Sequence, residues 1–172
     1  MSKLLIVVDM QNDFITGSLG TPKSKAIVPN VEKKIREYQN CGNEIIFTRD
    51  SHFNNYLETQ EGKNLPVTHC IYGTNGWEIL DELNVSNCTH VDKKSFGYAY
   101  WRDLLIHYDF DEIELIGVCT DICVVSNALI LKTFYPEVKI TVDASCCAGV
   151  TPETHKAALE TMKMCQINVI GE

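Results

Sequence analysis

The 172-residue sequence has no long uninterrupted apolar stretch. Its first apolar run covers residues 4–8 and ends at Asp9, so it is too short for a membrane span and wrongly flanked for a secretion signal. Basic residues are few, because 15 Lys and Arg stand against 23 Asp and Glu, for a net charge of −8. Nucleic acids and anionic membranes are bound through clustered cations, so we expect neither as a partner.

The sequence also has no Cys-x-x-Cys pair among its eight cysteines, which argues against a structural zinc ribbon. In the absence of a secretion signal we expect reduced thiols and a cytoplasmic protein. Low-complexity linkers, internal repeats and shifts of composition are missing as well. We therefore predict that residues 1–172 form a single domain, which is long enough to bury a core without disulfides.

What recurs along the chain is a short, β-branched apolar run followed by a stretch of helical periodicity. This alternation predicts a doubly wound, three-layer α/β/α fold around a mostly parallel sheet. The predicted strands are 4–8, 44–48, 89–91, 113–118, 138–142 and 167–170. The predicted helices are 27–41, 77–83, 100–108, 121–134 and 152–165. The polar segment 50–75 shows little periodicity, and loops of this length are usually functional.

Reactive side chains follow four of the predicted strands. Asp9 ends the first strand, and Asp50 and His52 follow the second. Lys93 follows the third strand, and Cys123 lies in the first turn of the helix after the fourth. Because ligands of open α/β sheets bind beyond the carboxyl ends of the strands, we expect these five side chains to meet at one edge.

Cys123 is the candidate nucleophile. The thiolate is the reactive form, and unpaired N–H groups at a helix start favour an anion there and can form an oxyanion hole. An arbitrary cysteine is more often a small buried apolar residue. That interpretation is kept for Cys41, Cys88, Cys146, Cys147 and Cys165.

Asp9 and Lys93 are the candidate partners of the thiol. Asp9 interrupts an apolar strand, and a buried carboxylate needs a cation or donors. It is interpreted as a general base that takes the thiol proton and later gives it to a leaving amine. The alternative is a carboxylate that caps the amides of the turn at residues 11–14. Lys93 would supply positive charge that favours both anions, with Lys94 as the alternative inward lysine.

Asp50, His52 and His69 are candidate metal ligands. Residues two apart in an extended segment point the same way, so the first two can share one ion, and His69 would return from the long loop. Two imidazoles and one carboxylate suit Zn²⁺, Fe²⁺ or Mn²⁺ with open positions for water or substrate. Glu61 is either a fourth ligand or a solvated side chain.

Five segments together resemble the isochorismatase-like cysteine hydrolases, and most closely their nicotinamidase (pyrazinamidase) branch. The similarity runs in order over nearly the whole chain and is specific as a set. It implies a six-stranded parallel sheet between helix layers, and an oligomer, as is common in the family. The segments are DMQNDF at 9–14, TRDSH at 48–52, PVTHC at 66–70, KKSFG at 93–97 and GVCTDIC at 117–123.

The resemblance implies a nicotinamidase that hydrolyses nicotinamide to nicotinate and ammonia through a thioester. Asp9, Lys93 and Cys123 would be its triad, with Lys93 preferred to Lys94 because the family's lysine directly ends the strand. The resemblance also implies a cis peptide before Cys119, which turns the backbone amides of Cys119 and Cys123 into the oxyanion hole.

The nicotinamidase branch carries the metal motif, whose ion, usually zinc or iron, binds the pyridine nitrogen. Phe14 matches an aromatic residue that lines the ring pocket. Leu65 stands where an aromatic residue usually precedes the turn to the second ligand histidine, so Tyr98 or Tyr100 would have to replace the stacking partner. Another small amide, a ureido compound or a vinyl ether is therefore an alternative substrate. Two further alternatives are a non-catalytic metal- or ligand-binding member and a thiol redox sensor that uses Cys119 and Cys123.

Overall fold

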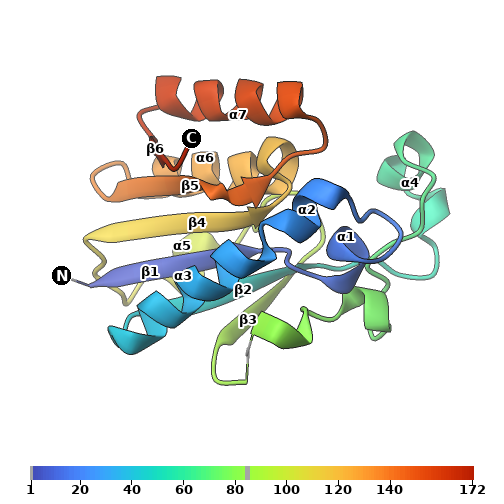
Figure 1. Ribbon diagram of the computed structural model, residues 1–172, viewed down its shortest axis with the longest axis horizontal. Coiled ribbons are helices and arrows are strands. Elements are labelled where there is room, and N and C mark those ends of the chain that lie inside the picture. Colours follow the sequence, from blue (N-terminus) through green and yellow to red (C-terminus); the bar gives the residue numbers. More distant parts are fainter. Residues whose placement is uncertain (1, 84–85) are drawn as a thin grey trace.

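The computed structural model of the chain describes residues 2–83 and 86–172. Six strands form one sheet in the order β3-β2-β1-β4-β5-β6, and every neighbouring pair is parallel (Figure 1). The predicted three-layer α/β fold is thereby confirmed. The strands are β1 (Lys3–Val8), β2 (Glu44–Asp50), β3 (Thr89–Lys93), β4 (Glu112–Val118), β5 (Lys139–Ala148) and β6 (Asn168–Ile170).

Helices cover both faces of the sheet, and several are short. Among the residues that the structure describes, none of the helices has the length and apolar content of a membrane-spanning segment. The α-helices are α1 (Asn12–Ile15), α2 (Pro22–Ala26), α3 (Val28–Asn40), α4 (Gln60–Asn64), α5 (Trp101–Leu104), α6 (Val125–Phe134) and α7 (Pro152–Met164). A π-helical turn, Thr120–Val124, leads into α6, and 3₁₀ turns cover Tyr56–Glu58, Asn75–Trp77 and Asp81–Leu83.

The residues of β1 show how the sheet separates two cores. Leu4 and Ile6 join a cluster with residues of α5, α6 and α7, whereas Leu5 and Val7 join a cluster with residues of α3. All four side chains are fully buried. The apolar run at the start of the chain is therefore the two-sided pattern of a central strand in a parallel sheet.

The chain changes direction across the sheet at β1. It first builds β2 and β3 on one side of β1, and then crosses to build β4, β5 and β6 on the other. The ends of β1 and β4 thus form the topological switch point, where open α/β sheets bind ligands. Asp9 and the turn that carries Cys123 follow these two strands directly.

Gly117 lets β4 run close to β1 at this switch point. It pairs with Val8 and has a φ of +116°, a conformation that L side chains rarely adopt. A Cβ atom at this position would overlap the carbonyl oxygen and the backbone nitrogen of Val8. A side chain at position 117 would therefore push the two strands apart.

Two predicted helices are wrong in extent. Residues 77–83 contain 3₁₀ turns rather than an α-helix, because Ile79 bridges Gln11 in an antiparallel pair and Leu80 N donates to Met10 O at 3.0 Å. The helix predicted at 100–108 is a single α-helical turn, α5, followed by further turns. In residues 77–83 these tertiary contacts override the helical spacing of the apolar residues.

The expectation of burial is confirmed for some of the spare cysteines and wrong for others. Cys146 and Cys147 are buried in β5, and Cys88 is partly buried. Cys41 and Cys165 are exposed, because they are the C-cap residues of α3 and α7.

Candidate active site

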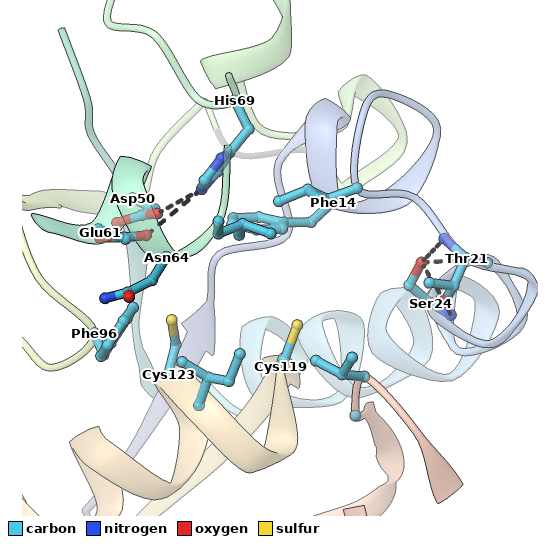
Figure 2. A pocket seen from close by; sticks show the side chains of 15 residues that line it. Phe14, Thr21, Ser24, Asp50, Glu61, Asn64, His69, Phe96, Cys119 and Cys123 are labelled. Carbon is cyan, nitrogen blue, oxygen red and sulfur yellow. Dashed lines mark hydrogen bonds and ion pairs between the residues drawn. The ribbon is translucent and has the colours of Figure 1, made fainter. Parts of the chain in front are cut away.

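A cavity of about 480 Å³ lies beyond the carboxyl ends of the strands (Figure 2). Six of the predicted site residues line it. They are Phe14, Asp50, Leu65, His69, Cys119 and Cys123. In Figure 2 the sulfur atoms of Cys119 and Cys123 point into the cavity from the side of the π-helical turn, opposite the side chains of His69 and Phe14.

Lys93 connects three of the reactive side chains. Its ammonium nitrogen lies 2.7 Å from Asp9 Oδ2, 3.1 Å from Asp50 Oδ1 and 3.4 Å from Cys123 Sγ. Lys93 is 1% exposed, whereas Lys94 is exposed, with its ammonium 5.7 Å from the Phe53 ring centroid. Lys93 is therefore the inward lysine of the pair. Burial alone would lower its pKa, but the opposite charges of its partners raise the pKa well above its usual value.

Asp9 is held in an uncommon conformation at the end of β1. Its φ is +50°, and its carboxylate accepts a 2.6 Å hydrogen bond from the Thr48 hydroxyl in addition to the contact with Lys93. The carboxylate thus faces its partners from β2 and β3, which argues against the alternative of a cap on the 11–14 turn. Complete burial outweighs the charge of Lys93 and raises the pKa of Asp9, so this carboxylate holds a proton more readily than an exposed one.

The surroundings of Cys123 favour its neutral thiol over the thiolate. Burial raises its pKa well above the usual value, and the negative charges of Asp9 and Asp50, with a hydrogen bond to Asp9, outweigh the lowering effect of Lys93. The helix start was expected to favour a thiolate, but this site keeps the neutral form. A thiolate at this position would therefore have to be generated by proton transfer to a neighbouring base.

The predicted metal ligands converge, and Glu61 joins them. One ligand atom from each of Asp50, His52, Glu61 and His69 lies within 4.8 Å of the others. Asp50 Oδ2 lies 2.9 Å from His52 Nε2 and 3.6 Å from His69 Nε2, and Glu61 Oε1 lies 3.6 Å and 3.8 Å from the same two nitrogens. Ligand atoms of a tetrahedral zinc site are about 3.4 Å apart, so this donor set fits a divalent ion.

The protonation of His69 also fits a metal ligand. Its Nδ1 donates to the carbonyl oxygen of Val67 at 2.7 Å, which leaves a lone pair on Nε2, the nitrogen that faces Asp50 and Glu61. The charge of Lys93, helped by the 2.9 Å contact with His52, overcomes burial and lowers the pKa of Asp50 well below the usual range, which keeps this carboxylate ionised.

The π-helical turn that carries Cys123 is braced by α7. The peptide bond between Val118 and Cys119 is cis, as the resemblance implied. Thr120 Oγ1 lies 2.8 Å from Nδ1 of His155, and the Asp121 carboxylate accepts hydrogen bonds from the Val150 amide at 3.0 and 3.1 Å. Burial, followed by the charge of Asp121, raises the pKa of Cys119 to about 12, so this second thiol is neutral.

The residues predicted to contact the substrate divide into two groups. Phe14 and Leu65 line the cavity, but Tyr98 is not among its lining residues, because its ring packs against Trp101 and Tyr100. Phe96, which was not predicted, lines the cavity instead. Its place in the Lys-Lys-Ser-Phe-Gly segment is the sequence signal that could have found it.

Known sequences identify the family to which this site belongs. The isochorismatase domain matches residues 3–171. The chain belongs to the isochorismatase family. The nicotinamidase of Saccharomyces cerevisiae is 25% identical and covers 99% of this chain and 100% of its own. A protein of Arabidopsis thaliana, named a probable inactive nicotinamidase, is 32% identical and covers 92% of this chain and 87% of its own.

A solved structure of the isochorismatase family shows the same architecture. The pyrazinamidase of Pyrococcus horikoshii, crystallised in complex with zinc, aligns with a TM-score of 0.88 and 27% identity over 100% of both chains. With the nicotinamidase relatives, this similarity identifies the chain as an amidase hydrolase of the isochorismatase family.

Proposed function

We propose that the chain is a nicotinamidase that hydrolyses nicotinamide to nicotinate and ammonia, with Cys123 as its nucleophile. The observation that carries the proposal is the buried contact of one ammonium, that of Lys93, with both the Asp9 carboxylate and the Cys123 thiol. A buried lysine between a thiol and a carboxylate suits nucleophilic catalysis better than passive ligand binding. The relatives named nicotinamidase support the choice of substrate.

In the first half of the proposed reaction, Asp9 takes the thiol proton while the sulfur of Cys123 attacks the carboxamide carbon. A carbon–sulfur bond forms, and the carbonyl oxygen becomes an oxyanion that the backbone amides of Cys119 and Cys123 accept. The protonated Asp9 then gives its proton to the amide nitrogen, the carbon–nitrogen bond breaks and ammonia leaves. Lys93 keeps its charge throughout and offsets the negative charge that develops on sulfur.

In the second half, water hydrolyses the thioester. Asp9 takes a proton from the water as its oxygen attacks the carbonyl carbon, and the carbon–sulfur bond breaks as Cys123 regains a proton. Nicotinic acid leaves and loses its proton to solvent as nicotinate, and the Cys123 thiol and the Asp9 carboxylate return to their starting states. The raised pKa of Asp9 supports its use as base and acid in alternation.

Asp50, His52 and His69 would hold a divalent ion, with Glu61 as a fourth ligand. We propose zinc, with iron or manganese as alternatives, because two imidazoles and carboxylate oxygens suit all three. When bound, the ion supplies an electrophilic contact that orients the substrate by its pyridine nitrogen.

A different small amide is the second candidate substrate, and the shape of the cavity favours it. The cavity volume of about 480 Å³ lies in the range of about 300–1,000 Å³ that holds drug-sized ligands, which exceeds what one pyridine ring needs. Leu65, at the position where the resemblance implied an aromatic residue, lines this space together with Phe14 and Phe96 and is 38% exposed. Ureido compounds and vinyl ethers, the other substrates that the sequence left open, belong in the same comparison.

The experiment that tests the proposal is ammonia release from nicotinamide by the purified protein, with and without chelator. We expect one ammonia to be released for each nicotinate formed. Removal of the metal should lower kcat/KM by at least about tenfold. A panel of pyrazinamide, benzamide and aliphatic amides run in parallel decides the substrate. Release from the panel without release from nicotinamide would replace the proposed substrate, and no release from any amide would refute the proposed function.

We also propose that the enzyme is one domain, acts in the cytoplasm and forms a homo-oligomer with no nucleic-acid or membrane partner. The eight cysteines are free, which suits a reducing compartment. Sedimentation velocity measures the oligomeric state directly, and a monomer at micromolar concentration would contradict that part of the proposal.

A further inference from the structure

The turn that follows β1 contacts both segments that carry the candidate metal ligands. Gln11 is fully buried, and its side-chain amide makes two hydrogen bonds with the backbone of Asp50. Nε2 donates to Asp50 O at 2.9 Å, and Oε1 accepts from Asp50 N at 2.7 Å. Two residues on, Asp13 reaches the segment that carries His69. Its Oδ2 accepts a hydrogen bond from the Cys70 amide at 2.7 Å. The hydrogen bond between Asp13 and Cys70 has no part in the proposed reaction.

Cys70 is the residue through which Asp13 reaches the ligand. It directly follows His69, is fully buried and has a φ of +47°, a conformation unfavourable for a residue with a side chain. Its peptide groups are bound at both ends, because its N–H donates to Asp13 and its carbonyl oxygen accepts from His52 N at 3.0 Å. Such a conformation persists only where the surroundings specify it.

The chain also leaves room for the Asp13 carboxylate. A Cβ atom at Gly76 would overlap both carboxylate oxygens of Asp13, so a side chain there would displace the carboxylate from the Cys70 amide. Gly76 is not among the glycines with a positive φ, so its backbone conformation does not require glycine. What requires glycine at this position is the space that the Asp13 carboxylate occupies.

We propose that Asp13 is a positioning residue for His69. By accepting the buried Cys70 N–H, it fixes the left-handed turn that aims His69 Nε2 at Asp50 and Glu61 (Figure 2). The inference rests on the proposed metal site and adds to it a residue that touches neither metal nor substrate. Without the acceptor, the buried amide is left unpaired and the turn relaxes, which moves the imidazole away from the other ligands.

Asp13→Ala and Asp13→Asn test the proposal, with zinc affinity measured by competition against a chromophoric chelator. We expect Asp13→Ala to bind zinc about 10–100-fold more weakly, the usual effect of losing a group that orients a ligand. Asp13→Asn keeps an oxygen that accepts the same N–H and should stay within about threefold of the wild type. The visible spectrum of the cobalt-substituted protein should change in Asp13→Ala and be retained in Asp13→Asn.

Asn12→Ala is the matched control. Asn12 lies in the same turn, and its side-chain amide donates to Asn75 O at 2.8 Å, away from the ligand segments. Equal zinc loss in Asn12→Ala and Asp13→Ala, or unchanged zinc affinity in Asp13→Ala, would overturn the inference. Equal loss in Asp13→Asn and Asp13→Ala would overturn the acceptor role. If Asp13→Ala does not fold, Asp13→Ser replaces it, because the shorter side chain of serine moves the acceptor away from the Cys70 amide. The zinc affinities expected for Asp13→Ala then apply to Asp13→Ser.

Two further measurements separate this inference from the proposed function. A wild-type protein that binds no zinc would overturn both. A wild type that binds zinc but releases no ammonia would refute only the proposed function, because the zinc measurement does not depend on turnover. The alkylation rate of Cys123 should be the same in wild type and Asp13→Ala, whereas a general disruption of the site would change it.

Discussion

At the scale of single residues, the site is a set of contacts around one buried ammonium, that of Lys93, which lies beside two carboxylates and the Cys123 thiol. The Lys93 ammonium is shared by the carboxylates of Asp9 and Asp50, so the proposed catalytic and metal-binding halves meet at one nitrogen atom. A positive charge that is shared in this way stabilises each anion less than an exclusive partner would. Burial is the main cause that raises the pKa of Cys123, and the shared charge of Lys93, whose ammonium lies 3.4 Å from the thiol, does not overcome it.

We expect Cys123→Ala to lower amide hydrolysis by at least about 10⁴-fold, because a nucleophile cannot be replaced by its neighbours. Zinc content and the unfolding midpoint should stay close to those of the wild type, since the change removes one atom. Cys165→Ala, at an exposed thiol on the end of α7, is the control for general cysteine loss. An active Cys123→Ala protein would rule out the proposed thioester.

At the scale of elements, α7 supports the site although it carries none of the proposed catalytic residues. Its first turn contacts the π-helical turn through His155 and through Thr154, whose hydroxyl donates to Asp121. Thr151 caps this helix, accepting the Thr154 amide at 3.1 Å, and Pro152 occupies the first helical position. Two sets of contacts therefore hold the start of α7, its own N-cap and the turn that carries Cys123.

Thr151→Ala should lower the free energy of unfolding by about 1 kcal/mol, the usual cost of a lost N-cap. Urea denaturation followed by circular dichroism measures the change. Thr161→Ala applies the same substitution within α7, where the Thr161 hydroxyl only bonds back to Ala157 O at 2.9 Å. There alanine should be neutral or slightly stabilising, because it is the better helix former. Equal destabilisation by both variants would show that the cap contributes nothing specific.

These elements also show what the sequence could predict. The cap and proline of α7 and the apolar run of β1 are local signals, and both elements form where they were expected. The rule that ligands bind at strand ends brought Asp9 and Lys93 to one place. The position of Glu61 could not be predicted, because the path of the 51–75 loop depends on contacts with distant segments, such as the bridge between His52 and Ile71.

At the scale of the whole molecule, the far end of the sheet is held by ion pairs. Glu112, at the start of β4, accepts the ammonium groups of Lys3 from β1 at 2.8 Å and of Lys139 from β5 at 2.9 Å. Burial alone would raise its pKa, but the bonds from Lys3, Thr141 and Lys139 lower the pKa to about 2. The three neighbouring strands β1, β4 and β5 are thus joined at the end opposite the cavity.

This cluster predicts a pH dependence of stability. Because the folded carboxylate of Glu112 has a pKa of about 2 instead of 4.5, its contribution is complete above pH 4.5 and is lost as the pH falls toward 2. Glu112→Gln should therefore lower the urea midpoint at neutral pH, and the difference from wild type should shrink steadily between pH 4.5 and 2. Glu137→Gln, at an exposed position, is the control. A difference that stays constant with pH would contradict the assignment.

Gly117 has a consequence for how this chain can evolve. Gly117 has no side chain and takes no part in the proposed reaction, yet it sets how closely β4 approaches β1. It thereby also sets how closely the π-helical turn that carries Cys123 approaches Asp9. Substrate preference can drift through Leu65 or Phe96 by exchanges of side-chain size. Position 117 allows no such gradual change in side-chain size, because even the methyl group of alanine would overlap the main chain of Val8. Mutational tolerance should therefore be lowest at a residue that no chemical argument would single out.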